Sequence, residues 1–463
     1  MAERSSTLVT ASPGACLQRQ RHRQWLSGCD GATFEALVER YGAALAQLPA
    51  RPARVLLLEP RPYRFLAALL AAVAADCHVF LGNPCWGQRE RAQVGRWVQP
   101  DLTLGALPLA PRTGGEPRPA IAARAARVAI PTGGSSGALR FALHSWETLM
   151  AAAAGFARYW GGVPAHTLDV LPLYHVSGLM PFLRALVTGG QFAAMPFKAL
   201  TPQRRAAIAP EGQFLSLVPL QLQRLLEAGA GTWLARFRAV LLGGAPASAE
   251  LLAAARAQRI PLAPSYGMTE TAAQVAALAP AAFGAGCNSS GGALPHARIT
   301  VRDGSGAVLP PGRTGTIAIR ASSLYLGYYG ESGSPPDPFL SDDRGYLDAA
   351  GRLHWVGRRS QTILTGGESV APEEVEAALL ETGLVSEACV VGLPDPVWGQ
   401  AVAAAYIPRS PQVTTERLRA AIARGLSACK RPKTWLALER LPRTDRGKRD
   451  RTRIAQLLER GRS

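Results

Sequence analysis

Lysine is rare in this chain, and one lysine stands where a flexible cation could do chemistry. The 463 residues contain 47 arginines but only four lysines, at positions 198, 430, 433 and 448. Lys448 lies within "LPRTDRGKRDRTRI", residues 441–454, among five arginines. Arginine presents a rigid planar fork, whereas lysine carries a compact charge on a flexible stem. Lys448 is therefore a candidate for reaching one oxygen atom in a confined site. The alternative, which local composition alone favours, is a solvated lysine in a basic tail.

A loop rich in glycine and hydroxyl groups follows the expected strand "ARVAI". The stretch "TGGSSGALR" runs from Thr132 to Arg140. Its backbone N–H and hydroxyl donors suit the phosphate groups of a nucleotide. It is not a Walker A loop, because no Gly-Lys-Ser/Thr follows at the required spacing. Alone, such a loop is more often just a turn.

A hydroxyl next to a carboxylate follows another expected strand. Thr269 and Glu270, in "SYGMTET", could together bind a phosphate oxygen and its Mg²⁺. The alternative is a helix start, with Thr269 as the cap and Glu270 placed favourably against the helix dipole. Two further strand ends carry candidates: His175 in "PLYHVSGLM", and the glycines of "AVLLGGAPAS", which allow a flat ligand to approach the backbone.

The elements that must position these residues alternate between short apolar runs and alanine-rich helical stretches. Strands alternating with helices indicate βαβ units and an α/β fold with a mainly parallel, doubly wound sheet. After residue 290 the pattern "ARITVRDGSGAVLPPGRTGTIAIRA" is typical of β-hairpins. A last unit of mixed strands and helices begins near residue 358. We therefore predict a domain of residues 1–357 and a small α+β domain of residues 358–463.

Composition permits several classes of protein and disfavours others. The formal charge of +18 and the pI near 10.3 would suit a nucleic-acid-binding protein. The arginines are scattered, however, and no basic face with interleaved aromatic residues is evident. We expect small anionic substrates and no nucleic acid; base composition of the gene also explains the arginines.

Cysteine usage and hydropathy give the expected compartment. The seven cysteines are widely spaced and form no Cys-x-x-Cys motif, which favours free thiols in a reducing compartment over a zinc site. The first residues include no apolar segment typical of a signal peptide. The longest apolar run, "FLAALLAAVAA" at 65–75, is too short to span a bilayer and indicates a buried helix. We expect a cytoplasmic protein; the sequence does not indicate its oligomeric state.

Five stretches in this order resemble the adenylate-forming superfamily, which includes acyl- and aryl-CoA ligases and firefly luciferase. The resemblance runs from about residue 50 to the C-terminus and is carried by "TGGSSGALR", "YGMTE", "SDDRGYLDAAGRLHWVGR", "GGESVAPEEVE" and "LPRTDRGK". Within the superfamily, "FLGNP", "PTGGSSG" and "PLYHVSGL" are most similar to 2-succinylbenzoate–CoA ligases, especially the photosynthetic type that feeds phylloquinone synthesis.

The resemblance implies a large ATP- and acyl-binding domain, a β-rich subdomain and a mobile C-terminal domain. The carboxylate would attack MgATP to give an acyl-adenylate, from which CoA would displace AMP. It also implies roles for individual residues. The β- and γ-phosphates would be held by Thr132, Gly133, Gly134, Ser135, Ser136 and Gly137. Adenine would be flanked by Gly244, Ala245, Pro246, Tyr266 and Gly267. The remaining roles are Thr269 for the α-phosphate, Glu270 for magnesium, Asp343 and Arg358 for ribose, His175 for the acyl pocket, Gly366 and Gly367 for the pantetheine channel, and Lys448 for adenylation.

Three departures from the family pattern accompany this resemblance. Leu139-Arg140 replaces the usual Pro-Lys after the phosphate loop, and Ser360 occupies the hinge position. The family's Thr-Gly-Asp triplet is Ser341-Asp342-Asp343, which retains only the aspartate. Another acyl- or aryl-CoA ligase is the alternative function. Amino-acid activation is disfavoured, because "YHVSGLMPF" offers no acid for an α-ammonium group.

Overall fold

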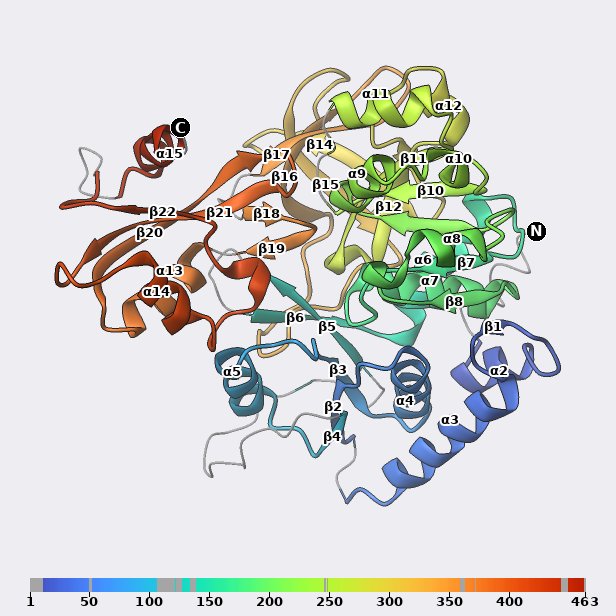
Figure 1. Cartoon of the computed structure of the whole chain (residues 1–463). Coiled ribbons are helices and arrows are strands. Elements are labelled where there is room, and N and C mark those ends of the chain that lie inside the picture. Colours follow the sequence, from blue (N-terminus) through green and yellow to red (C-terminus); the bar gives the residue numbers. More distant parts are fainter. Residues whose placement is uncertain are drawn as a thin grey trace.

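The computed structural model describes residues 11–49, 52–105, 121, 127–133, 139–244, 247, 249–358, 363–370, 372–442 and 449–461. In these residues the strands form four sheets, three of them before residue 359. Figure 1 shows the fourth sheet and its helices to one side of the larger part of the molecule. The α/β class, the β-rich part and the small α+β unit predicted from the sequence are confirmed.

A five-stranded sheet has the order β4–β2–β3–β5–β6, and only the pair β5–β6 is antiparallel. Residues of β2 and β3 are buried along their whole length, as expected for strands covered on both faces. The strands are β2 (Arg54–Leu58), β3 (His78–Leu81), β4 (Leu102–Gly105), β5 (Arg127–Gly133) and β6 (Leu139–His144). The accompanying helices are α2 (Pro13–Gln18), α3 (Gly31–Ala46), α4 (Pro62–Ala74) and α5 (Gln88–Val98).

An eight-stranded sheet has the order β1–β8–β7–β9–β10–β11–β12–β13 and is parallel as far as β11. Its strands are β1 (Leu26–Ser27), β7 (Thr167–Asp169), β8 (Phe192–Ala194), β9 (Phe214–Leu217), β10 (Ala239–Leu242), β11 (Leu262–Met268), β12 (Ala273–Ala277) and β13 (Gly292–Ala293). The helices are α6 (Trp146–Tyr159), α7 (Val176–Thr188), α8 (Pro202–Ala206), α9 (Pro219–Glu227), α10 (Gly231–Leu234), α11 (Ala249–Ala257) and α12 (Pro280–Gly284), with 3₁₀ turns η1 (Phe197–Ala199) and η2 (Thr269–Thr271).

One hydrophobic core joins the two parallel sheets. It contains side chains of β2, β3 and β5 from one sheet, of β1 and β8 from the other, and of helices α4, α6 and α7. Helix α4 begins at Pro62 and is buried continuously from Phe65 to Val73, which explains why its sequence is apolar on every face. The sheets are thereby held in a fixed relation to each other.

The predicted hairpin region is an antiparallel sheet in the order β14–β15–β16–β17. Its strands are β14 (Ala297–Arg302), β15 (Gly315–Ala321), β16 (Phe339–Leu347) and β17 (Leu353–Arg358). The last sheet has the order β19–β18–β21–β20, with β22 beside β21. It comprises β18 (Ile363–Thr365), β19 (Glu368–Val370), β20 (Val385–Asp395), β21 (Gly399–Pro408) and β22 (Thr434–Ala437), with α13 (Pro372–Glu381), α14 (Thr415–Ile422), η3 (Ala428–Lys430) and α15 (Arg451–Arg460).

The short hairpin β18–β19 approaches the larger part of the molecule. Residues of β19 contact β5, and Figure 1 shows the hairpin on the side of the C-terminal sheet that faces the larger part of the molecule. Within the described part of the chain, no helix is both long and apolar enough to cross a membrane.

Candidate active site

The carboxyl ends of the parallel strands meet around one cavity of about 480 Å³. Residues that follow β7, β9 and β10 line it, including Leu171, Val218 and Gly243, together with Ser265 near the end of β11. Ligands of open α/β sheets bind at this edge, because strand ends and loops leave a crevice there. The sheet β14–β17 and the hairpin β18–β19 complete the wall with Asp343 and Gly367.

Of the expected site residues that the structure describes, most come together in this cavity. Those that line it are Thr132, His175, Gly244, Gly267, Thr269, Glu270, Asp343 and Gly367. Stretches that lie up to 235 positions apart in the sequence therefore share one site. Gly366 precedes Gly367 in the turn between β18 and β19.

Several expected residues lie outside the described residues: Gly134, Ser135, Ser136, Gly137, Ala245, Pro246 and Lys448. Two others are placed by their backbone alone. Gly133 pairs with Leu139 across β5 and β6, and Arg358 pairs with Asp343 across β17 and β16. The second pairing puts the two residues expected at the ribose on neighbouring strands.

Glu270 is a buried acid that a tyrosine holds in place. The residue is only 8% exposed, and the Tyr328 hydroxyl donates a hydrogen bond of 2.7 Å to its Oε1. Burial and the Glu270 charge raise the pKa of Tyr328, so its phenol stays protonated and donates. Arg140 lies over the face of the Tyr328 ring, with its guanidinium carbon 3.6 Å from the ring centroid. Arg140 also pairs with Glu331 at 2.6 Å.

Thr269 does not cap a helix, so the helix-start interpretation of "SYGMTET" is wrong. Thr269–Thr271 form the single 3₁₀ turn η2, and Met268 holds the capping position. The carbonyl oxygen of Thr269 lies 2.8 Å from Nε2 of His144. Burial lowers the pKa of His144 to about 4, so this imidazole is neutral at pH 7 and donates to the carbonyl. His144 thus fixes the backbone of the turn.

Asp343 is held by two donors from different strands. The Tyr266 hydroxyl donates to its Oδ2 at 2.9 Å, and the Trp355 indole donates to its Oδ1 at 3.1 Å. Tyr266, which the resemblance places beside adenine, is itself buried. The two donors fix the direction of the Asp343 carboxylate at the cavity wall.

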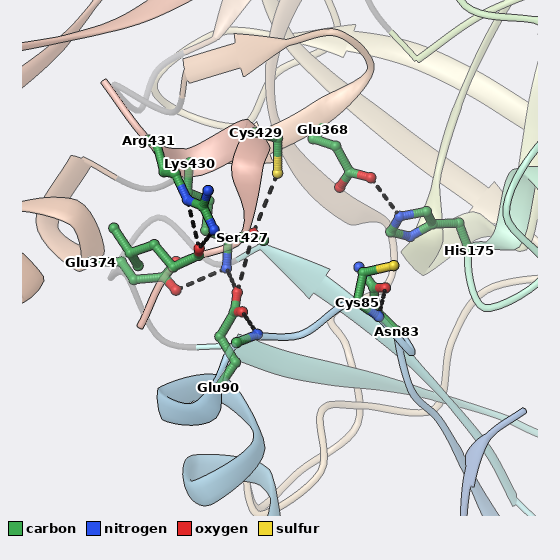
Figure 2. Close-up of polar contacts among 12 residues, drawn as sticks. Asn83, Cys85, Glu90, His175, Glu368, Glu374, Ser427, Cys429, Lys430 and Arg431 are labelled. Atoms are coloured by element: carbon green, nitrogen blue, oxygen red, sulfur yellow. Dashed lines mark hydrogen bonds and ion pairs between the residues drawn. The ribbon is translucent and has the colours of Figure 1, made fainter. Parts of the chain in front are cut away.

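His175 joins the two parts of the molecule. It precedes helix α7, and its Nε2 lies 2.9 Å from Oε1 of Glu368 on β19 (Figure 2). Burial alone would disfavour the imidazolium, but the Glu368 charge and hydrogen bond raise the pKa of His175 above its ordinary value. Burial would raise the pKa of Glu368, but the charge and hydrogen bond of His175, together with the charge of Lys430, hold it below its ordinary value.

The two glycines before Glu368 let the hairpin come close to the cavity. Gly366 and Gly367 both have positive φ, at 59° and 86°. A Cβ atom on Gly367 would lie 2.8 Å from Cγ1 of Val218, and one on Gly366 would lie 2.7 Å from the Trp398 ring. Side chains larger than hydrogen would therefore push β19 away from Val218.

Arg184 is a cavity residue that sequence reasoning missed. It lies on α7, is 4% exposed, and lines the same cavity as His175 and Glu270. Burial lowers the pKa of Arg184 to about 9, which leaves it charged at pH 7. Its guanidinium faces the Phe156 ring at 4.1 Å, and among the described residues its Nε has no hydrogen-bond partner. Burial raises the pKa of Asp169, and the charges of Asp169 and Arg184 act on each other across this buried space.

The donor set suits magnesium bound together with a nucleotide. No cluster of three or more His, Cys, Asp or Glu side chains that could enclose a metal occurs in the described residues. Mg²⁺ is commonly held by one or two carboxylates plus substrate phosphates, and Glu270 with the neighbouring Thr269 hydroxyl supplies oxygen ligands of that kind. Glu270 would hold the ion, which would neutralise charge on the departing pyrophosphate.

The match to known sequences establishes the family. The model of AMP-binding enzymes matches residues 99–329, and that of their C-terminal domain matches residues 374–448. The 2-succinylbenzoate–CoA ligase of a Geobacillus species (strain WCH70) is 32% identical over 336 residues, which are 71% of this chain and 68% of that protein. The chain belongs to the family of AMP-binding enzymes.

Other relatives have the same name. The 2-succinylbenzoate–CoA ligase of Bacillus anthracis (strain A0248) is 33% identical over 298 residues, or 63% of this chain. That match spans 61% of the length of the relative. The o-succinylbenzoate CoA synthetase of Bacillus subtilis has been solved in two states that matter here.

As a double mutant with the product analogue OSB-NCoA, the Bacillus subtilis enzyme matches with a TM-score of 0.83 and 25% identity, covering 95% of this chain and 98% of that one. With the acyl-adenylate intermediate OSB-AMP, the TM-score is 0.64 at 24% identity, covering 95% and 97%.

Proposed function

We propose that this enzyme ligates 2-succinylbenzoate to CoA at the expense of ATP. In the first half-reaction an oxygen of the acid attacks the α-phosphorus of ATP, and the bond to pyrophosphate breaks. In the second half-reaction the CoA sulfur, having lost its proton, attacks the acyl carbon, and the bond to AMP breaks. ATP, Mg²⁺ and CoA are the required small molecules, and the reaction would serve quinone biosynthesis, as the resemblance implies.

The observation that carries this substrate is the buried cation Arg184 in the cavity wall. A benzoate or fatty acid has one carboxylate, which the chemistry consumes. 2-Succinylbenzoate keeps a second carboxylate, which must lose its water on entering a buried pocket. Such a loss is costly unless a charged partner is present, and Arg184 supplies one. Arg184 lines the cavity, and a guanidinium offers a fork of N–H donors that matches the geometry of a carboxylate.

The remaining proposed roles follow from the cavity. Glu270 would hold the magnesium ion, Asp343 would accept hydrogen bonds from ribose hydroxyls, and His175 would line the acyl site. Lys448 and the other undescribed positions keep the roles that the resemblance implies. We also infer that residues 358–463 form a separate domain that rotates between the half-reactions.

The observed arrangement supports the second half-reaction. The whole chain has a higher TM-score against the Bacillus subtilis enzyme with a CoA product analogue than against the same enzyme with the acyl-adenylate, which favours this orientation. In the same arrangement, Gly367 and Glu368 line the cavity. We also place the enzyme in the cytoplasm, because its seven cysteines are free thiols.

A pyrophosphate-release assay over a panel of carboxylic acids, with and without CoA, tests the proposal. We expect 2-succinylbenzoate to give the highest kcat/KM and a CoA thioester product. A higher kcat/KM for benzoate or a medium-chain fatty acid would overturn the substrate but leave an acyl- or aryl-CoA ligase. If none of the acids led to pyrophosphate release, both the proposed substrate and the proposed ligase activity would be overturned.

A further inference from the structure

A lysine of the C-terminal part is buried between two acids that come from different parts of the molecule. Nζ of Lys430 lies 2.6 Å from Oε1 of Glu90 and 2.8 Å from Oε1 of Glu374 (Figure 2). The side chains of Lys430, Glu90 and Glu374 are 14%, 4% and 15% exposed. Ion pairs this sheltered are weakly screened by salt, unlike exposed pairs.

The three residues belong to elements on both sides of the interface. Lys430 ends η3, and Glu374 lies in the first turn of α13, so both lie beyond residue 358. Glu90 lies on α5, beside the first parallel sheet. Of the two ion pairs that Lys430 makes, a rotation of the C-terminal domain would keep the one with Glu374 and separate the one with Glu90.

Glu90 is held in place by its own helix. Its Oε2 accepts a hydrogen bond of 2.7 Å from the backbone N–H of Gly87, at the start of α5. Its Oε1 receives Lys430 and, at 3.4 Å, the Ser427 hydroxyl. The acceptor for the lysine therefore exists whichever way the C-terminal domain faces, and little side-chain entropy is lost when the two meet.

The backbone around Glu90 is also shaped for this contact. The N–H of Gln88 donates to the carbonyl of Arg424 at 3.1 Å. A Cβ atom on Gly87 would lie 3.0 Å from backbone atoms of Gly425, so glycine permits the two segments to touch. Direct backbone contact at this point brings Lys430 to the carboxylate.

The charge of Lys430 offsets part of the repulsion between the two carboxylates. Burial raises the pKa of Glu374, because the nearby Lys430 offsets only part of the cost of burying that carboxylate. The two carboxylates raise the pKa of Lys430 although burial opposes this. Without Lys430, two carboxylates would face each other in a poorly hydrated space, and the domains would separate to admit water.

We propose that the ion pair between Lys430 and Glu90 is a positioning contact that holds the C-terminal domain in the orientation for thioester formation. Glu374 keeps the lysine extended toward the interface in both orientations. The pair forms and breaks once in each catalytic cycle, so it sets the share of enzyme ready to accept CoA. This inference rests on the proposed two-step reaction, and neither residue touches the reacting atoms.

Glu90→Gln is the test, because the amide can keep its oxygen on the Gly87 N–H, while the charge and the acceptor that face Lys430 are lost. We expect thioester formation from supplied acyl-adenylate and CoA to fall by about 10- to 100-fold, the range for losing one member of a sheltered charge pair. Pyrophosphate release during adenylation should stay within about threefold, and the melting temperature should hardly change. Equal losses in both half-reactions would contradict the positioning role.

Glu381→Gln is the matched control at the same interface. Glu381 on α13 pairs with Arg89 on α5 at 2.9 Å, but its side chain is 66% exposed. An exposed pair contributes little, so both half-reactions should keep nearly their full rates. A loss in this variant as large as in Glu90→Gln would show that any charge across the interface suffices and would overturn the special role of Lys430.

A measurement that needs no substrate separates this inference from the proposed reaction. Spectroscopic labels, introduced as unnatural amino acids at exposed positions of α3 and α14, report the distance between the two parts of the molecule. We expect the population at the distance of the observed arrangement to shrink in Glu90→Gln and to persist in Glu381→Gln. Equal populations in wild type and Glu90→Gln, or no such population in wild type, would overturn the proposal even if the enzyme is active.

Discussion

At the scale of single residues, Glu270 depends on neighbours that are distant in sequence. Its carboxylate is held by Tyr328, and the carbonyl of the preceding Thr269 is held by His144. The 3₁₀ turn η2 is too short to fix a side chain by itself, so these two hydrogen bonds supply the order. An acid held in this way can receive a metal ion without first rearranging.

Glu270→Ala should lower the rate of adenylation by about 10²-fold or more, because the cation that stabilises the departing pyrophosphate would lose its protein ligand. Loss of one hydrogen bond to Tyr328 should cost only about 1 kcal/mol of the free energy of unfolding. Pyrophosphate release and thermal unfolding are the two measurements. Glu331→Ala, which removes the exposed partner of Arg140, is the control and should leave adenylation nearly unchanged. A destabilised but active Glu270→Ala enzyme would contradict the assignment.

The sequence predicted the residues that follow strand ends but not those that support them. Thr269, Glu270 and His175 stand next to apolar runs and attract attention by their position. Arg184 stands inside the apolar helix "VSGLMPFLRALVT", where one arginine resembles a solvated residue. Lys430 and Glu90 are 340 positions apart, and only the folded chain makes them neighbours. A lone charge within an otherwise apolar helix face is the one signal that could have indicated Arg184.

At the scale of elements, the hairpin β18–β19 is the part of the C-terminal unit that reaches the cavity. Each of its strands has three residues, so it shows no period that sequence reasoning can use. The short strand β22 was missed for the same reason. By contrast, β2 and β10 are buried at every residue, and burial on both faces gives the nearly continuous apolar runs that sequence reasoning recognises.

Gly367→Ala should selectively impair the half-reaction that needs the hairpin. The new Cβ would lie 2.8 Å from Val218, so β19 would have to move away from the cavity. Thioester formation from supplied acyl-adenylate should fall by at least about 10-fold, and adenylation should change little, because the hairpin is then in its other position.

Gly383→Ala separates this contact from backbone strain. Gly383 also has a positive φ, of 69°, but a Cβ atom there would meet nothing within 4 Å. Each substitution should cost about 1–2 kcal/mol of stability through the left-handed conformation. Only Gly367→Ala should also slow thioester formation. Equal kinetics in the two variants would mean that the close approach to Val218 is unimportant.

At the scale of the whole molecule, one cavity is built from two parts that also touch elsewhere. His175 with Glu368 closes the interface beside the cavity, and Lys430 with Glu90 closes it farther out (Figure 2). The cavity in this arrangement therefore depends on contacts outside it. Within that cavity, Arg184 is the residue from which we infer a substrate with a second carboxylate.

The most direct test of this account compares two acids in two proteins. 3-Benzoylpropionate has the skeleton of 2-succinylbenzoate without the carboxylate on the ring. The wild-type enzyme should prefer 2-succinylbenzoate by about 10⁴-fold in kcat/KM, as expected for a site that bonds a buried polar group. In Arg184→Gln this ratio should fall by at least about 10²-fold, with pyrophosphate release from 3-benzoylpropionate serving as the check that the variant is folded. A wild-type ratio near one, or an unchanged ratio in the variant, would contradict the account.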